Sequence, residues 1–188
     1  MLSAVRVAGS EGRPSDLRLM QTWDAITSRR NVRSFDGRPI SAESLDQILE
    51  AGRRTPSSRN SQPADFVLVT DRAQLEQLAT AWVGAGHVAR SAATIALIID
   101  ESAEGGRRVQ FDLGQVTMSM MLAAADLGIG SCHAGIGDEE IARQALGLPA
   151  NKSCAFLISL GYPADRPLTP IKNPDRRAFD DVVHRGRW

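Results

Sequence analysis

Apolar residues recur every three or four positions in several stretches of this chain, a spacing typical of helices that bury one face. The pattern predicts five helices: from Leu19 to about Arg29, from Ser41 to Gly52, from Asp71 with Leu75, Leu78 and Trp82 on one face, from about Val109 to Leu127, and from Asp138 to Gly147. Ser41 and Asp71 suit helix N-caps, and Gly128 suits the position after a helix C-terminus. The long helix at 109–127 is apolar over most of its circumference, so we expect it at the molecule's centre or in a subunit interface.

Short apolar runs between these helices predict strands. They are Phe66–Thr70, Thr94–Ile99 and Ala155–Leu160, with a glycine-rich strand or loop at 129–137. The unbroken apolar run at 94–99 indicates a strand that is buried on both faces. Helices and strands do not alternate strictly, which favours an α+β fold over a doubly wound one.

The chain of 188 residues has the length of one ordinary domain. No internal repeat or linker divides it, so residues 19–188 are predicted to form a single domain. Residues 1–18 combine two glycines, a proline and mixed charges, which predicts a flexible N-terminal extension. The tail that follows Gly161 carries four prolines, so we expect it to be extended and to wrap over a neighbour.

Composition narrows the possible functions. Apolar residues make up 43% of the chain and charged residues 23%, which supports a sizeable core and argues against disorder. The 22 cations balance the 22 anions, which excludes a general nucleic-acid-binding surface. Only Lys152 and Lys172 are lysines, so 20 of the 22 cations are arginines, whose rigid fork suits phosphate and carboxylate. A genome that favours arginine codons accounts for most of these arginines. The question for function is whether a few of them converge on one anion.

Other classes lack their signals. Cys132 and Cys154 have no ligand spacing or further partners, so neither a disulfide framework nor a metal site is indicated. No apolar run approaches the roughly 20 residues of a membrane helix, and residues 1–18 lack the apolar core of a signal peptide. We therefore expect a cytoplasmic protein with no membrane or nucleic-acid partner. Gly128-Ile129-Gly130 follows a helix and lacks a third glycine, so it does not indicate a Rossmann site.

The first cluster that carries chemistry contains Arg29, Arg30 and Arg33 at the end of a predicted helix. Three guanidiniums so close together can fan toward one phosphate. The alternative is compensation of the helix dipole together with surface ion pairs.

Two further clusters present polar groups and bare backbone. The loop at 56–63 is bounded by prolines and rich in hydroxyls and amides, which suit a heteroaromatic ring or a sugar chain, although an ordinary turn has the same composition. The glycines at 128–137, after the helix that contains Asp112 and Gly114, let the backbone approach a flat ligand or pack tightly against a helix.

Together these clusters resemble the nitroreductase family of FMN-dependent oxidoreductases over about residues 20–188. The matching stretches are Arg29-Arg30-Asn31-Val32-Arg33-Ser34-Phe35, Pro56-Ser57-Ser58-Arg59-Asn60-Ser61-Gln62-Pro63, Leu122-Ala-Ala-Ala-Asp-Leu-Gly128 with Gly130-Ser-Cys132, Leu160-Gly-Tyr-Pro163, and the basic tail with Arg176, Arg177 and Trp188. No single motif is decisive, but their order over this length is a strong signal.

The resemblance implies an intertwined homodimer with a central mixed sheet flanked by helices and with two FMN sites at the subunit interface. It implies that the FMN phosphate and ring edge are held by Arg29, Arg30, Asn31, Arg33 and Arg176 or Arg177. The partner subunit would line the flavin ring with Pro56, Ser57, Ser58, Asn60 and Gln62. The backbone of His133, Ala134 and Gly135 would face the reactive ring atoms.

The resemblance also implies the chemistry, which belongs mostly to the flavin. NADH or NADPH would reduce FMN, leave, and be replaced by a small-molecule acceptor such as a quinone or nitroaromatic, in ping-pong order. No side-chain acid or base is required. His133 could donate a hydrogen bond to the substrate, although a structural role beside the flavin is the alternative that we favour. Contact of His87 with the pyrimidine edge of the flavin is left open. Two alternatives stay open: a metabolite-specific flavoenzyme on the same fold, and a non-catalytic flavin-binding module.

Three departures from the family pattern concern the substrate. Asn31 replaces the usual serine, and Ala64 stands where many members carry an aromatic residue. The short connections after Leu78 and around 105–108 leave no room for the helical insertion that covers the substrate face in larger members. We therefore expect the substrate, more than the cofactor, to differ within the family.

Overall fold

The chain folds as a four-stranded sheet with helices on both faces, in a computed structural model that describes residues 21–103 and 106–188. The predicted extension at residues 1–18 lies outside the described residues. The strands are β1 (Asp65–Val69), β2 (Ala93–Asp100), β3 (Gly130–Gly135) and β4 (Lys152–Gly161), and the α-helices are α1 (Thr22–Ser28), α2 (Ala42–Arg53), α3 (Arg72–Ala79), α4 (Arg107–Asp126) and α5 (Glu139–Leu146). Short 3₁₀ turns are η1 (Ser58–Asn60), η2 (Val83–Ala85), η3 (Val88–Arg90), η4 (Glu101–Ala103) and η5 (Phe179–Asp181).

The sheet has the order β1-β2-β4-β3, and all three of its ladders are antiparallel. Our expectation of a mixed sheet needs correction at this point: among the described residues, parallel pairing is limited to an isolated bridge between Asn31 and Ser131. The segment at Asn31 runs along β3 for only one residue, so it adds no full strand. The predicted α+β class is confirmed.

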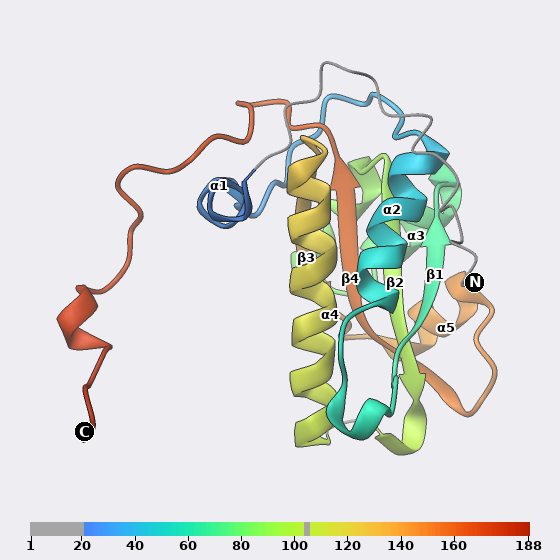
Figure 1. Cartoon of the computed structure of the whole chain (residues 1–188). Helices are drawn as coiled ribbons and strands as arrows, with labels where there is room; N and C mark the ends of the chain where they lie inside the picture. Colours follow the sequence, from blue (N-terminus) through green and yellow to red (C-terminus); the bar gives the residue numbers. More distant parts are fainter. Residues whose placement is uncertain (1–20, 104–105) are drawn as a thin grey trace, which may run out of the picture.

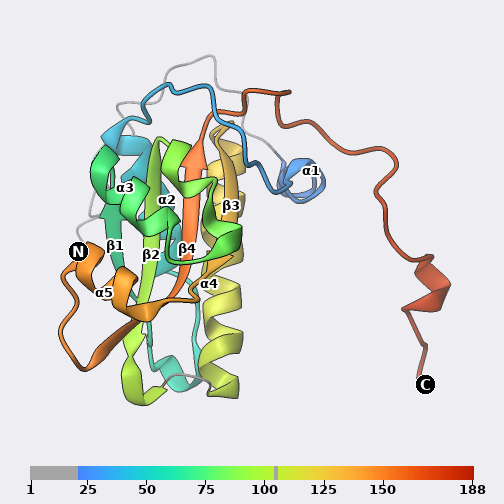
Figure 2. The ribbon, with the colours of Figure 1, turned by 180° about the vertical axis from the view of Figure 1, so that it is seen from behind.

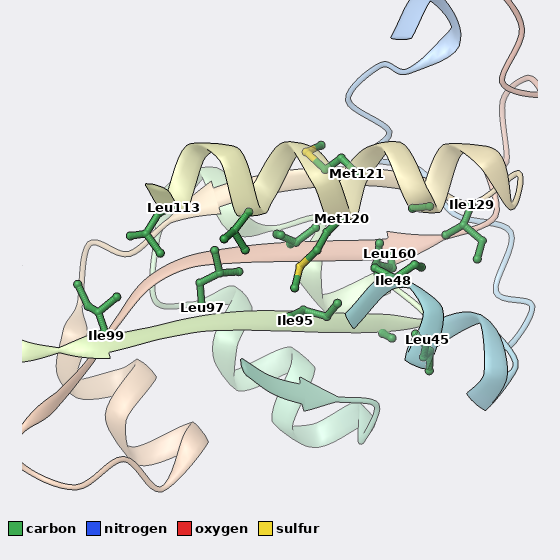
Figure 3. Packing of buried hydrophobic residues seen from close by; sticks show 14 residues of the cluster. Leu45, Ile48, Ile95, Leu97, Ile99, Leu113, Met120, Met121, Ile129 and Leu160 are labelled. Carbon is green, nitrogen blue, oxygen red and sulfur yellow. The ribbon is translucent and has the colours of Figure 1, made fainter. Parts of the chain in front are cut away.

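Strand β2 lies at the centre and is buried on both faces from Ala93 to Ile99, as its unbroken apolar run predicted. Ile95, Leu97 and Ile99 point toward α4 and α2, where they pack against Met120 and Ile48 (Figure 3). The intervening residues of β2 face α3 and α5 on the opposite side (Figure 2). Such two-sided burial fixes the register of β2, because a slip by one residue would exchange the two cores.

Several predicted helix ends are confirmed. The side chains of Ser41, Asp71 and Asp138 accept hydrogen bonds from backbone N–H groups in the first turns of α2, α3 and α5. Gly128 and Gly147 have φ of 71° and 65°, the left-handed conformation that ends a helix at low cost with glycine. Strand β4 is longer than the predicted 155–160 and begins at Lys152.

Three residues on predicted helix faces are more exposed than expected. Trp82 was expected on the buried face of the helix that begins at Asp71, but α3 ends at Ala79 and Trp82 is 46% exposed. In α1, Trp23 and Ile26 share a face as predicted, yet they are 71% and 47% exposed. Local periodicity placed these residues on one face, but no element in the described parts of the chain buries that face.

Both ends of the described chain lie outside the sheet and the helices that cover it. Helix α1 stands beside α4 apart from the sheet, and residues beyond Arg166 run outward as an extended tail (Figures 1 and 2). Two hydrogen bonds join the C-terminal region to residues near α1. Ala164 N donates to Ser34 O, and Ile171 N donates to Thr27 O of α1, both at 3.1 Å. Its apolar residues Phe179, Val182 and Trp188 are exposed, so this arm has no apolar partner among the described residues of its own chain.

Candidate functional site

The segment at 29–35 lies against the edge of the sheet. Val32 N donates to Ser131 O at 2.9 Å, and single bridges join Asn31 to Ser131 and Phe35 to Pro163. A Cβ atom at Gly130 would stand 2.7 Å from the Val32 side chain, and one at Gly161 would stand 2.6 Å from the Phe35 ring. Both glycines therefore leave room for the inward side chains of this segment.

Arg29 is half-buried in the direction of α4. Its Nη2 donates to Asn31 Oδ1 at 3.0 Å and touches Met121 Sδ at 3.2 Å. Its Nε is buried without a hydrogen-bond partner among the described residues. Burial lowers the pKa of Arg29, and the charge of Arg176 adds to that effect, although the group stays cationic. A buried, partly unsatisfied guanidinium next to a second cation indicates a place for an anion.

Arg33 extends this positive region. Burial is the main cause that lowers the pKa of both His87 and His133, and the charge of Arg33 lowers each pKa further. At Cys132 burial raises the pKa, whereas Arg33 and Arg29 oppose that rise. No carboxylate contributes to any of these three shifts, so the surroundings of β3 favour a negative ligand.

The other predicted arginines are placed less uniformly. Arg30 already donates to Asp165 Oδ1 at 2.7 Å and to Arg166 O at 2.9 Å, so its guanidinium is engaged. Arg177 donates to Asp181 O at 2.8 Å within the tail. Of the two tail arginines, Arg176 is the one close enough to Arg29 to affect its pKa.

A hollow of about 240 Å³ opens beside α4 next to these cations. It is lined by Arg29, Gln110, Gly114, Thr117, Met118, Met121, His133 and Phe156. Two predicted site residues, Arg29 and His133, therefore share one cavity, which we call the arginine-side hollow. His133 is exposed there, whereas Ala134 is buried and Gly135 is half-buried.

His87 belongs to a buried hydrogen-bonded chain. Its Nδ1 lies 2.7 Å from Ser159 Oγ, and that hydroxyl donates to Cys132 O at 3.1 Å. Because the only hydroxyl proton of Ser159 is used on the carbonyl, the ring of His87 must supply the proton of the first bond from Nδ1. The arrangement fixes the tautomer of neutral His87 and leaves its Nε2 as an acceptor.

The loop at 56–62 is hydrogen-bonded to α4. Asp112 is 2% exposed, and its two carboxylate oxygens accept from Ser58 N at 3.2 and 3.0 Å. Ser57 Oγ accepts from Gln62 N at 2.8 Å across the loop. Three non-glycine residues of the loop, Arg59, Asn60 and Gln62, have positive φ between 47° and 56°. Left-handed residues concentrated in one loop are typical of functional sites.

This loop borders a second hollow of about 610 Å³, which we call the loop-side hollow. It is lined by Pro56, Ser57, Ser58, Arg107, Arg108, Phe111, Asp112 and Gln115. The predicted residues Asn60 and Gln62 are exposed on the same loop.

Helix α4 separates the two hollows. Arg29 touches Met121, and Ser58 bonds to Asp112, nine residues earlier on the helix. Nine helical residues correspond to about 14 Å along the axis and about half a turn around it. The arginines and the loop of one chain therefore lie on opposite sides of α4.

Sequence reasoning missed the positioning role of Asp112 and the pairing of His87 with Ser159. The available signal for Asp112 was a carboxylate in the interior of a largely apolar helix, since buried acids require a partner. For Ser159, inside an apolar strand, the sequence contained no comparable signal. Among the described residues, no group of histidine, cysteine and acidic side chains could hold a metal ion. No helix in the described parts is long and apolar enough to cross a bilayer.

Comparison with known proteins places this geometry in a family. The model of the nitroreductase family matches residues 26–85 and 79–162. A provisionally named NADH dehydrogenase/NAD(P)H nitroreductase of Archaeoglobus fulgidus is 31% identical over 172 residues, which cover 87% of this chain and 96% of that protein.

Two solved structures have the same fold. The NADPH:FMN oxidoreductase of Vibrio harveyi, in complex with NAD⁺, has a TM-score of 0.75 at 26% identity and covers 89% of this chain and 77% of its own. An FMN-dependent nitroreductase of Clostridium difficile has a TM-score of 0.78 at 24% identity, over 88% of this chain and 99% of its own. Sequence and fold agree, and the chain belongs to the nitroreductase family.

Proposed function

We propose that this protein transfers electrons from NADH or NADPH through FMN to a small acceptor such as a nitroaromatic or a quinone, in ping-pong order. Membership of the family makes it an NAD(P)H-dependent flavin oxidoreductase. The acceptor class and the order of steps are the further content of the proposal. We place the FMN-binding unit within residues 19–188.

The residues of the arginine-side hollow fit the phosphate of FMN. The Nε of Arg29 is buried without a partner among the described residues, Arg176 is close by, and Arg33 raises the positive potential around β3. Each charge-assisted hydrogen bond to a phosphate contributes roughly 1.5–3 kcal/mol. The buried Nε of Arg29, which has no partner among the described residues, is the observation that carries the proposal. We assign Arg29, Asn31, Arg33 and Arg176 to the phosphate and ring edge, with Arg30 and Arg177 as outer residues because their guanidiniums are engaged.

The loop-side hollow supports a site that two chains complete. The contacts of Arg29 and Ser58 with α4 lie about 14 Å apart along the helix, which supports a site whose loop residues come from a second copy: Pro56, Ser57, Ser58, Asn60 and Gln62. The exposed apolar residues of α1 and of the tail supply a reason for the second copy to bind, because burial of such surface stabilises a dimer. We therefore propose a homodimer with FMN at the interface.

When bound, FMN accepts a hydride equivalent from the nicotinamide and later reduces the acceptor. The residues of the chain bind and orient the cofactor and the substrates, and they exclude water from the site. The cations would hold the phosphate, and we place the backbone at 133–135 beside the ring. Asp112 keeps the loop of the partner's site in its left-handed conformation. His87 supplies an acceptor at Nε2, since its tautomer is fixed through Ser159.

Purification tests the cofactor. We expect a yellow dimer that releases FMN on denaturation, and a colourless protein that cannot be reconstituted with FMN would overturn the proposal. Rapid bleaching of the flavin by NADPH or NADH in stopped-flow mixing separates a reductase from a flavin-storage module, which should show no rapid reduction. Parallel lines in double-reciprocal plots at several acceptor concentrations are expected for ping-pong order, and intersecting lines would contradict it.

A metabolite-specific flavoenzyme remains the second candidate, and the shape of the substrate side favours testing it. The loop-side hollow, of about 610 Å³, has room for a larger acceptor, and Ala64 lines a smaller hollow beside Gln62 and Pro63. Comparison of kcat/KM over a panel of quinones, nitroaromatics and cellular extracts distinguishes the two. Uniformly low values for all model acceptors would favour a dedicated metabolite.

A further inference from the structure

Two arginines on the loop-side hollow have no role in the fold. Arg107 and Arg108 are the first two residues of α4, both are exposed, and both line this hollow. Neither makes a hydrogen bond or ion pair with any residue in the described parts of the chain. By contrast, Arg53 and Arg54 share Glu50, and Lys152 bridges Asp65 and Asp100.

Their position on the helix argues against a stabilising role. The N-terminus of a helix carries partial positive charge, so cations there are unfavourable and acids are preferred. Helices α2 and α5 follow that preference with Glu43, Glu139 and Glu140 in their first turns, whereas α3 and α4 have no acid there. Two adjacent arginines at this end therefore cost stability, which indicates a function for them.

The hollow itself leaves the two charges uncompensated. Asp112 is its only acidic lining residue among the described residues, and both oxygens of that carboxylate accept from the backbone of Ser58. Phe111 lies one helical turn beyond Arg107 and Arg108 and is 69% exposed. Two guanidinium forks next to an uncovered aromatic ring suit a phosphate attached to a flat base. The volume of about 610 Å³ lies within the range of small-molecule sites.

We infer that Arg107 and Arg108 bind the adenosine 2′-phosphate of NADPH, with Phe111 against the adenine, and that the enzyme therefore prefers NADPH to NADH. This inference rests on the proposed function, because the hollow is bordered by the loop that we assign to the flavin of the partner. NADPH differs from NADH by this one phosphate, so the pair discriminates between the two donors by charge.

Isothermal titration of the FMN-loaded protein with two non-redox probes tests the inference without turnover. We expect adenosine 2′,5′-bisphosphate to bind about ten-fold or more tightly than adenosine 5′-monophosphate, as expected for added charge-assisted bonds to one phosphate. In the double variant Arg107→Gln/Arg108→Gln this ratio should fall to about two-fold or less, and the NADPH-to-NADH ratio of flavin reduction rates should fall with it. Arg54→Gln is the matched control, since it removes the same charge close to the same loop but outside the hollow.

The outcomes separate the two proposals. A yellow wild type that binds both probes equally, or a ratio that the double variant leaves unchanged, overturns the inference and leaves the proposed function intact. An equal loss in Arg54→Gln assigns the effect to general electrostatics and also overturns the inference. Loss of FMN from a folded double variant, checked by circular dichroism, would assign the pair to the phosphate of the flavin instead. A colourless wild type that cannot take up FMN overturns the proposed function itself.

Discussion

The two sides of α4 are built in different ways. On the arginine side, side chains of the segment at 29–35 pack inward against Gly130 and Gly161. This segment contains Arg29, whose buried Nε has no partner among the described residues. On the loop side, one buried carboxylate, Asp112, holds a loop with left-handed backbone. The first side provides charge and the second provides shape. Under the proposed function, one flavin site combines the arginine side of one chain with the loop side of a second copy.

The largest predicted effect is complementation between variants of the two sides. In a heterodimer of Arg33→Ala with Asp112→Ala, one site carries both changes and the other carries neither. At an FMN concentration that saturates the wild type but neither homodimeric variant, we expect about one FMN per heterodimer, since a two-fold interface contains two equivalent sites. Differently tagged chains allow its isolation, and absorbance measures the flavin. A heterodimer without FMN would mean that both sides serve one flavin within the same chain.

Arg33→Ala alone tests the arginine side. The affinity for FMN should fall about ten-fold or more, on the order of 1.4 kcal/mol, because a charge close to the phosphate is removed. Sedimentation should still find the dimer, and fluorescence titration measures the affinity. Arg38→Ala is the control, because Arg38 is an exposed arginine that pairs with Asp36 and stacks on Tyr162. Unchanged FMN affinity in Arg33→Ala would contradict the phosphate assignment.

Asp112→Asn tests the loop side with a smaller change. One amide oxygen replaces two carboxylate oxygens at Ser58 N, so the free energy of unfolding should fall by about 1–3 kcal/mol. We expect a several-fold loss of FMN affinity as the loop loosens. Urea denaturation measures the first effect and flavin titration the second. Asp46→Asn, an exposed acid on α2, is the matched control and should change neither quantity.

The smallest effect concerns His87, which lies beside Ser159 of β4. Burial, then Arg33 and His133, lowers the pKa of His87 below its ordinary 6.5. The unfolded chain therefore binds this proton more readily, so the stabilising contribution is complete above about pH 6.5 and is lost as the pH falls below it. His87→Gln should weaken the pH dependence of the free energy of unfolding between about pH 7 and 5, measured by urea denaturation. His184→Gln, in the exposed tail, should keep the dependence of the wild type. The same slope in His87→Gln and wild type would disprove the assignment.

Most elements could be predicted because they depend on local patterns. The caps at Ser41, Asp71 and Asp138, the buried run of β2 and the glycines after α4 and α5 all follow from short-range chemistry. Trp82 and the exposed face of α1 were harder, because burial depends on whether another element covers the face that periodicity defines. The role of Ser159 could not be predicted, since it depends on a histidine 72 positions away.

The sequence by itself determined the elements, the α+β class and the motifs of the nitroreductase family, because helix periodicity, capping and motif order are properties of neighbouring residues. Only the tertiary structure decided how the motifs are distributed around α4. It places the contacts of the arginines and of the loop about two and a half helical turns apart on α4, engages Arg30 with Asp165 and leaves the Nε of Arg29 without a partner among the described residues. It also turns Arg107 and Arg108 toward the loop-side hollow. These relations arise from the packing of segments that are distant along the chain, which local sequence does not encode.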